Sequence, residues 1–144
     1  MSFSWISLSK MNKTNKILIS LNVIFLLYYS IQLLIFTDEF SYNNLGSFNH
    51  AIAGLSEIIG IIFLSLAIAL VIIFRNKTKG QFPIFFTIFL IQLFIFINFL
   101  RYVFSNSPGE TSIESITFNA FIFFLGLIVS IFFLVKNYTN LKQF

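Results

Sequence analysis

The sequence has no cysteine, a single histidine and only five acidic residues among 144. The absence of cysteine excludes disulfides, thiol redox chemistry, iron–sulfur clusters and thiolate zinc sites. Charged residues make up 10% of the chain, whereas they make up about 25% of a typical soluble domain. The sequence also has no nucleophile motif, glycine-rich phosphate loop or zinc signature. These absences argue against a soluble enzyme, and we expect no catalytic residue, no metal and no cofactor.

Apolar side chains are abundant instead, at 58% of the residues, and the mean hydropathy is +0.92. Four apolar windows are long enough to cross a bilayer, which takes roughly 20 residues; they are residues 17–36, 51–74, 82–104 and 116–135. Because these runs are continuous rather than alternating, helices are favoured over the strands of a barrel. We therefore predict an all-α membrane protein, an antiparallel four-helix transmembrane bundle that forms a single domain over residues 1–144.

Charge is sorted between the two ends of these spans. Eight of the nine basic residues flank one end: Lys10, Lys13, Lys16, Arg75, Lys77, Lys79, Lys136 and Lys142. Four of the five acids flank the other end: Asp38, Glu39, Glu110 and Glu114. Short loops rich in lysine and arginine remain in the cytoplasm. Both termini are therefore predicted to be cytoplasmic, in a multi-pass protein of a prokaryotic cell membrane, and only Arg101 departs from the pattern.

The net charge of +4 does not indicate nucleic-acid binding. The basic residues form short clusters beside the spans, whereas a nucleic-acid site shows a basic stripe on a folded face. The lipid bilayer is the partner that these clusters suit, through anionic headgroups. Residues 37–50 and 105–115 are polar and are predicted to be connectors. A capping box, Thr111 to Glu114, is expected to begin the fourth span.

A layer of polar residues lies inside the spans, near the predicted outer surface. Glu57 lies six residues into the second span and Arg101 three residues before the end of the third, about 9 and 5 Å deep at 1.5 Å per residue. Because the two spans cross in opposite directions, both side chains can lie at one depth. The candidate polar site comprises Glu57, Arg101, Asn98, His50, Gln32, Tyr28 and Asn119.

Helical spacing allows these residues to face inward. His50 and Glu57 are seven residues apart, and Asn98 and Arg101 are three apart, so each pair shares a helix face. Near Glu57, Gly54 and Gly60 are small residues that let a neighbouring helix approach closely. Gly126 and Ser130 form a similar small pair on the fourth span. Gln92 lies off the Asn98–Arg101 face and is expected to make a packing hydrogen bond.

Two interpretations of Glu57 remain open. An acid costs roughly 2.5–3.5 kcal/mol at the centre of a membrane helix and less toward its ends, so Glu57 should be paired or protonated. In the structural interpretation, Glu57 and Arg101 staple the second span to the third. In the functional interpretation, the layer is a small site open to the outside that carries protons, binds a small molecule or holds a quinone headgroup.

The stretch from Asn49 to Gly60, NHAIAGLSEIIG, resembles the second span of DoxX-like membrane proteins. Those are four-helix proteins with a glutamate followed by a small residue in that helix. The resemblance covers 12 of the 144 residues. The glycines and the basic residue of a DoxX-like first span are absent here, so we do not assign the chain to that family. Small multidrug transporters also have four short spans, but their key glutamate lies in the first helix, where this chain has no acid.

The leading functional hypothesis is a non-enzymatic membrane protein, an accessory, assembly or immunity-type subunit that acts through its helix faces and loops. Its partner would be another membrane protein or a second copy of the chain. The alternative is a small transporter or a redox-linked, DoxX-like membrane protein that uses the polar layer around Glu57. Transport would favour a dimer, because four helices of this size enclose little space.

Overall fold

The structure, a computed structural model, describes residues 11–46, 48–75, 78–105 and 112–143, and these residues form five helices and no strands. The helices are α1 (Lys13–Leu34), α2 (Thr37–Leu45), α3 (His50–Arg75), α4 (Phe82–Ser105) and α5 (Ile113–Lys142). All but α2 are long and apolar enough to cross a membrane. The predicted all-helical class and its four long apolar helices are confirmed, while membrane insertion and the side on which the termini lie remain predictions.

The predicted spans differ from the helices mainly at their ends. Helix α1 ends at Leu34 rather than at residue 36, and α5 continues past residue 135 to Lys142. The extra turns of α5 are helical because Asn137 and Leu141 are still buried against the bundle. Hydropathy ends a span at the last apolar run, whereas packing continues the helix beyond it.

Some of the sequence-based expectations concern residues outside the described part of the chain. They include the flanking charges Lys10, Lys77 and Glu110. Thr111, the first residue of the expected capping box, also lies outside it. Ser112 occupies the position before α5, and its side chain makes no capping hydrogen bond.

The prediction that residues 37–50 form only a connector is wrong, because most of them form α2. Asp38 and Glu39 occupy its first turn, where negative charge stabilises the exposed backbone N–H groups. The Thr37 hydroxyl donates a hydrogen bond of 2.6 Å to the Leu33 carbonyl, which ties α2 to the end of α1. Gly46 ends α2 in the left-handed region, at φ 67°, where glycine is favoured.

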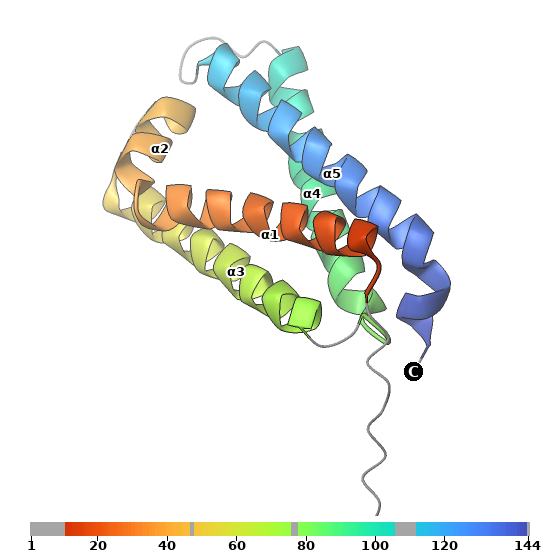
Figure 1. The fold of residues 1–144 in the computed structure, drawn as a ribbon. Helices are drawn as coiled ribbons and strands as arrows, with labels where there is room; N and C mark the ends of the chain where they lie inside the picture. The colour runs from red at the N-terminus through yellow and green to blue at the C-terminus, as the bar shows by residue number, and fades with distance from the viewer. Residues whose placement is uncertain (1–10, 47, 76–77, 106–111, 144) are drawn as a thin grey trace, which may run out of the picture.

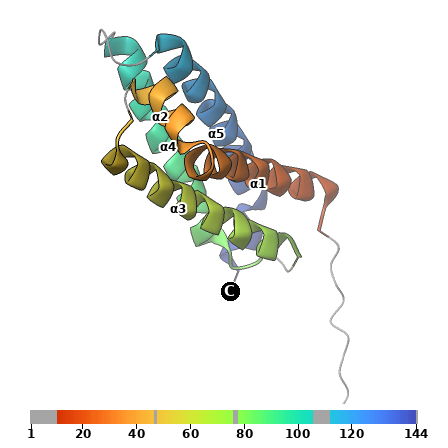
Figure 2. The ribbon, with the colours of Figure 1, turned by 90° about the vertical axis from the view of Figure 1, so that its left-hand side faces the viewer.

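The four long helices form two hairpins, and contacts between α1 and α5 join one hairpin to the other. Helix α1 packs against α3, and α4 packs against α5 (Figure 1). Helix α2 lies across one end of the bundle and contacts α1, α3 and α5 (Figure 2). We call this the α2 end; there α1 and α4 finish and α3 and α5 begin. The opposite end, where α1 and α4 begin, is the terminal end. Although α3 and α4 are consecutive, they share no extended interface within the described residues.

Two glycines allow the close helix contacts. A Cβ atom added to Gly60 would lie 2.8 Å from Leu34 Cγ, so α1 and α3 meet at that point. A Cβ atom added to Gly126 would lie 3.0 Å from Gln92 Nε2, where α4 meets α5. The expectation of close approach is therefore confirmed for Gly60 and Gly126. Within the described chain no helix approaches Gly54, whose added Cβ would meet nothing within 4 Å.

Candidate functional site

The polar layer expected from the sequence does not assemble in the interior. The side chains of His50, Glu57, Asn98 and Arg101 are all exposed. Tyr28 is 40% exposed, and Gln32 is half-buried. Only Asn119, at 4% exposure, lies inside the bundle. Depth along the helices was inferred from the sequence, but the faces on which these side chains lie were not inferred correctly.

The expected pairing of Glu57 with Arg101 is not formed within the described chain. The two residues lie on α3 and α4, which share no extended interface. The guanidinium of Arg101 instead lies over the ring of its neighbour Tyr102, with Cζ 5.2 Å from the ring centroid. The staple between the second and third spans is therefore wrong as an account of this fold.

The buried polar groups are a different set, which forms three layers between α1 and α5. The middle layer consists of Asn22, Gln92 and Ser130, all at most 4% exposed. Gln92 Nε2 donates to Asn22 Oδ1 at 3.1 Å. The Ser130 hydroxyl lies 2.6 Å from Gln92 Oε1 and 2.9 Å from Asn22 Oδ1, so its single proton can be donated to either. These bonds connect α1, α4 and α5, and the prediction of a packing hydrogen bond for Gln92 is confirmed.

The layer at the terminal end is a reciprocal pair of asparagines. Asn15 Nδ2 donates to Asn137 Oδ1 at 2.6 Å, and Asn137 Nδ2 donates back to Asn15 Oδ1 at 3.2 Å. Asn137 Nδ2 is also 2.9 Å from the carbonyl oxygen of Phe133. Both side chains are at most 8% exposed. The start of α1 is thereby fixed beside the last turns of α5.

The third layer connects α2 to the bundle. The Tyr29 hydroxyl donates to Asn119 Oδ1 at 2.8 Å. Asn119 Nδ2 donates to Asn44 Oδ1 on α2 at 2.8 Å, and the Ser115 hydroxyl donates to the same oxygen at 2.6 Å. Asn119, which belongs to the predicted site, thus binds Tyr29 rather than the neighbouring Tyr28. Its role in this fold is to hold α1, α2 and α5 together.

Replacing Tyr29 by phenylalanine is expected to lower the free energy of unfolding by about 0.5–1.5 kcal/mol, because Asn119 Oδ1 loses a buried donor while the ring packing is kept. The measurement is denaturant unfolding of the full chain in detergent, followed by helical circular dichroism. Tyr28→Phe is the matched control, since Tyr28 is exposed. Equal stabilities of the two variants would show that the Tyr29 hydroxyl contributes nothing.

The spacing of polar residues in the sequence predicts these layers, whereas the depth of each residue in its span does not. Asn15, Asn22 and Tyr29 are spaced by seven residues, so they lie on one face of α1. On α5, Ser130 and Asn137 show the same spacing. A polar residue repeated every two turns within an apolar helix marks the face that is turned toward the protein.

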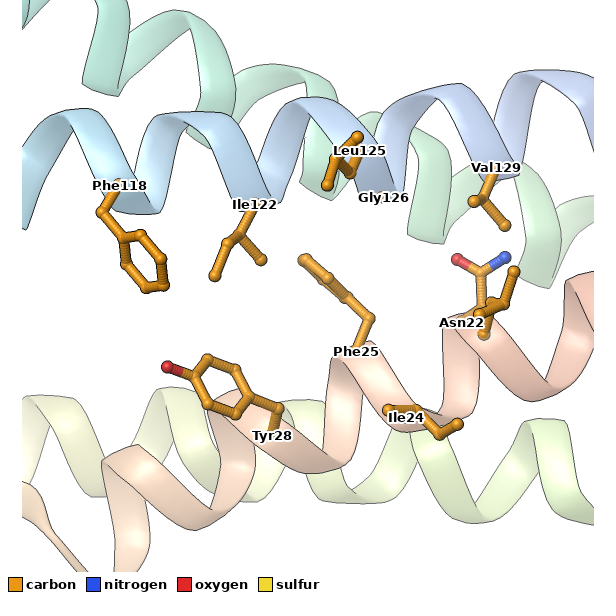
Figure 3. A pocket seen from close by; sticks show the side chains of 10 residues that line it. Asn22, Ile24, Phe25, Tyr28, Phe118, Ile122, Leu125, Gly126 and Val129 are labelled. Carbon is orange, nitrogen blue, oxygen red and sulfur yellow. The ribbon is translucent and has the colours of Figure 1, made fainter.

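An apolar groove of about 420 Å³ lies between α1 and α5 (Figure 3). Phe25 and Gly126 form part of its wall, and Ile24, Tyr28 and Phe118 lie at more exposed positions. The polar atoms of Asn22, which also lines it, are already bound to Leu18, Gln92 and Ser130. The groove thus offers apolar contact and suits a hydrocarbon chain better than a polar solute.

Among the residues that the structure describes, no three His, Asp or Glu side chains are grouped so that they could hold a metal ion. Comparison with family models, with curated proteins and with solved structures finds no match to this chain. The site must therefore be interpreted from its chemistry. The amides and hydroxyls of the three layers satisfy one another inside the bundle, whereas the hydroxyl of Ser41 is buried without a hydrogen-bond partner in the described chain. The charged side chains of Glu57 and Arg101 are exposed.

Proposed function

We propose that the chain is a non-enzymatic subunit of a membrane assembly, of accessory, assembly or immunity type, located in a cell membrane and acting through its exposed helix faces. The observation that supports this most is the position of Glu57, which is exposed on α3 seven residues after the helix begins at His50. A carboxylate on the surface of a spanning helix needs a partner that the described chain does not provide.

The cost of leaving such a group uncovered is substantial. Insertion scales assign roughly 2.5–3.5 kcal/mol to an acid or base at the centre of a membrane helix, and less toward its ends. Arg101 faces the same problem on α4, where Asn98 is exposed one turn away. Intramembrane charges usually face other protein or water rather than lipid. Contact with another spanning helix would remove both costs.

A transporter or redox site has less support. Such a site needs polar groups that converge on a cavity. The amides and hydroxyls of the three buried layers are bonded to one another, and the groove between α1 and α5 is apolar. The exposed charges lie on α3 and α4, which share no extended interface in the described chain.

Site-specific photo-crosslinking in native membranes tests the proposal. A photoreactive residue at Ile58 or Ile97, which are 56% and 52% exposed beside Glu57 and Asn98, is expected to yield a discrete protein adduct. Glu57→Gln should abolish that adduct without lowering the yield of folded protein. Glu114→Gln is the matched control, because Glu114 is an exposed acid in the first turn of α5.

Adducts with lipid alone at both positions would contradict the proposal. So would a Glu57→Gln variant that keeps its fold and its protein adducts but loses a proton-linked or ligand-dependent activity. That second outcome would favour the transporter or redox alternative, because it would assign Glu57 to chemistry rather than to an interface.

A further inference from the structure

The positions of Glu57 and Arg101 along their helices bear on the partner of the exposed faces. Glu57 precedes Arg75, the last residue of α3, by 18 residues, and Arg101 follows Phe82, the first residue of α4, by 19. At 1.5 Å per residue, each lies about 27–29 Å along its helix from the short connection between α3 and α4. The acid and the base thus lie at similar distances along their helices, both toward the α2 end.

This arrangement is self-complementary. One copy carries an exposed acid on α3 and an exposed base on α4 at similar distances from the connection between these helices, and the two helices do not form an extended interface with each other in the described chain. If a two-fold axis brings the acid of one copy to the base of a second copy, symmetry forms the equivalent contact at the same time. We propose that the partner is a second copy of this chain, with Glu57 of each copy paired to Arg101 of the other.

Gly54 and Asn98, each one helical turn from one of the two charged residues, are suited to a contact with a helix of another copy. Gly54 lies one turn before Glu57, and the space above it is empty within 4 Å, so another helix can approach α3 closely there. Asn98 lies one turn before Arg101 and is exposed on α4. Its amide can donate a second hydrogen bond to a carboxylate that Arg101 already holds. The proposal rests on the proposed function, because it names the partner of the same faces.

Charge exchange between two differently tagged full-length copies tests this pairing. Glu57→Arg alone places arginine against arginine in a self-associated pair, and Arg101→Glu alone places acid against acid. Each variant should therefore lose self-association by about tenfold or more, measured by tag-to-tag co-purification in mild detergent. A mixture of the two variants restores an acid–base pair at both contacts, and association should return to the wild-type level.

The controls separate charge pairing from general damage. Glu114→Arg and Arg75→Glu reverse exposed charges elsewhere, and both should associate as the wild type does. Circular dichroism must show wild-type helicity for each variant. If a reversed charge prevents folding, Glu57→Gln and Arg101→Gln replace it, and each is expected to weaken self-association.

Self-association that persists in each single variant, or a mixture that does not recover, would overturn the proposed pairing. A wild-type chain that does not self-associate would overturn it too. In that case, a crosslinked adduct of Ile58 with a different membrane protein would leave the proposed function standing while this inference fails. Crosslinks to lipid alone, with no self-association, would remove both.

Discussion

Replacing Asn22 by leucine is expected to lower the free energy of unfolding by about 1–3 kcal/mol, the cost of a buried polar group left without its partner. Asn22 Oδ1 accepts from Gln92 at 3.1 Å and is 2.9 Å from the Ser130 hydroxyl. Ser130 can turn its proton to Gln92 Oε1, but the Gln92 amide loses its acceptor. Denaturant unfolding of the full chain in detergent measures the loss.

The matched control is Asn140→Leu, the same change at an exposed position of α5. It should alter the free energy of unfolding by less than about 0.5 kcal/mol, as surface substitutions usually do. If Asn22→Leu is as stable as Asn140→Leu, apolar packing alone sets the arrangement of α1, α4 and α5.

A double variant makes the test sharper. Removing both partners of a buried hydrogen bond costs less than removing one, because no group is left unpaired. Asn22→Leu combined with Gln92→Leu should therefore be less destabilised than the sum of the two single variants. The Ser130 hydroxyl then bonds to a carbonyl one turn back in α5, as serine does in helices. Simple additivity would show that the two amides do not interact.

The parts of the fold that follow from the sequence are those that depend on length and apolar content. Four runs of about 20 apolar residues suffice to predict four long helices, and the structure contains them. Helix α2 was missed because it has no apolar run. Its signals were present nonetheless: Asp38 and Glu39 at the start and Gly46 at the end.

The candidate site could not be placed from the sequence because two quantities are independent. One is the position of a residue along the helix axis, and the other is the side of the helix on which its side chain lies. Counting residues places Glu57 and Arg101 at similar distances along α3 and α4 from the connection between these helices. Whether these side chains face the rest of the protein depends on the rotation of α3 and α4 about their own axes. In an apolar helix this rotation is hard to read from the sequence, because lipid-facing and protein-facing positions carry similar apolar residues. The repeat of Asn15, Asn22 and Tyr29 was the informative pattern, because all three side chains are buried and each hydrogen-bonds to a residue of α4 or α5.

Replacing Gly60 by valine is expected to cost about 1–3 kcal/mol of unfolding free energy, because the added atoms overfill the contact between α3 and α1. The first added carbon alone would lie 2.8 Å from Leu34 Cγ and 3.0 Å from Leu33 Cβ. Gly54→Val is the matched control on the same helix, since no atom lies within 4 Å of its added Cβ. Unfolding is measured in detergent at a dilution where the chain is monomeric.

The two glycines separate folding from association. Gly60→Val should lower the unfolding free energy of the monomer, whereas Gly54→Val should leave it unchanged and weaken tag-to-tag co-purification at higher concentration. The reason is that Gly60 is covered by α1 of the same chain, while the space above Gly54 is open for a helix of another. If Gly54→Val destabilises the monomer as much as Gly60→Val does, Gly54 packs against its own chain and α3 presents no open face at that turn.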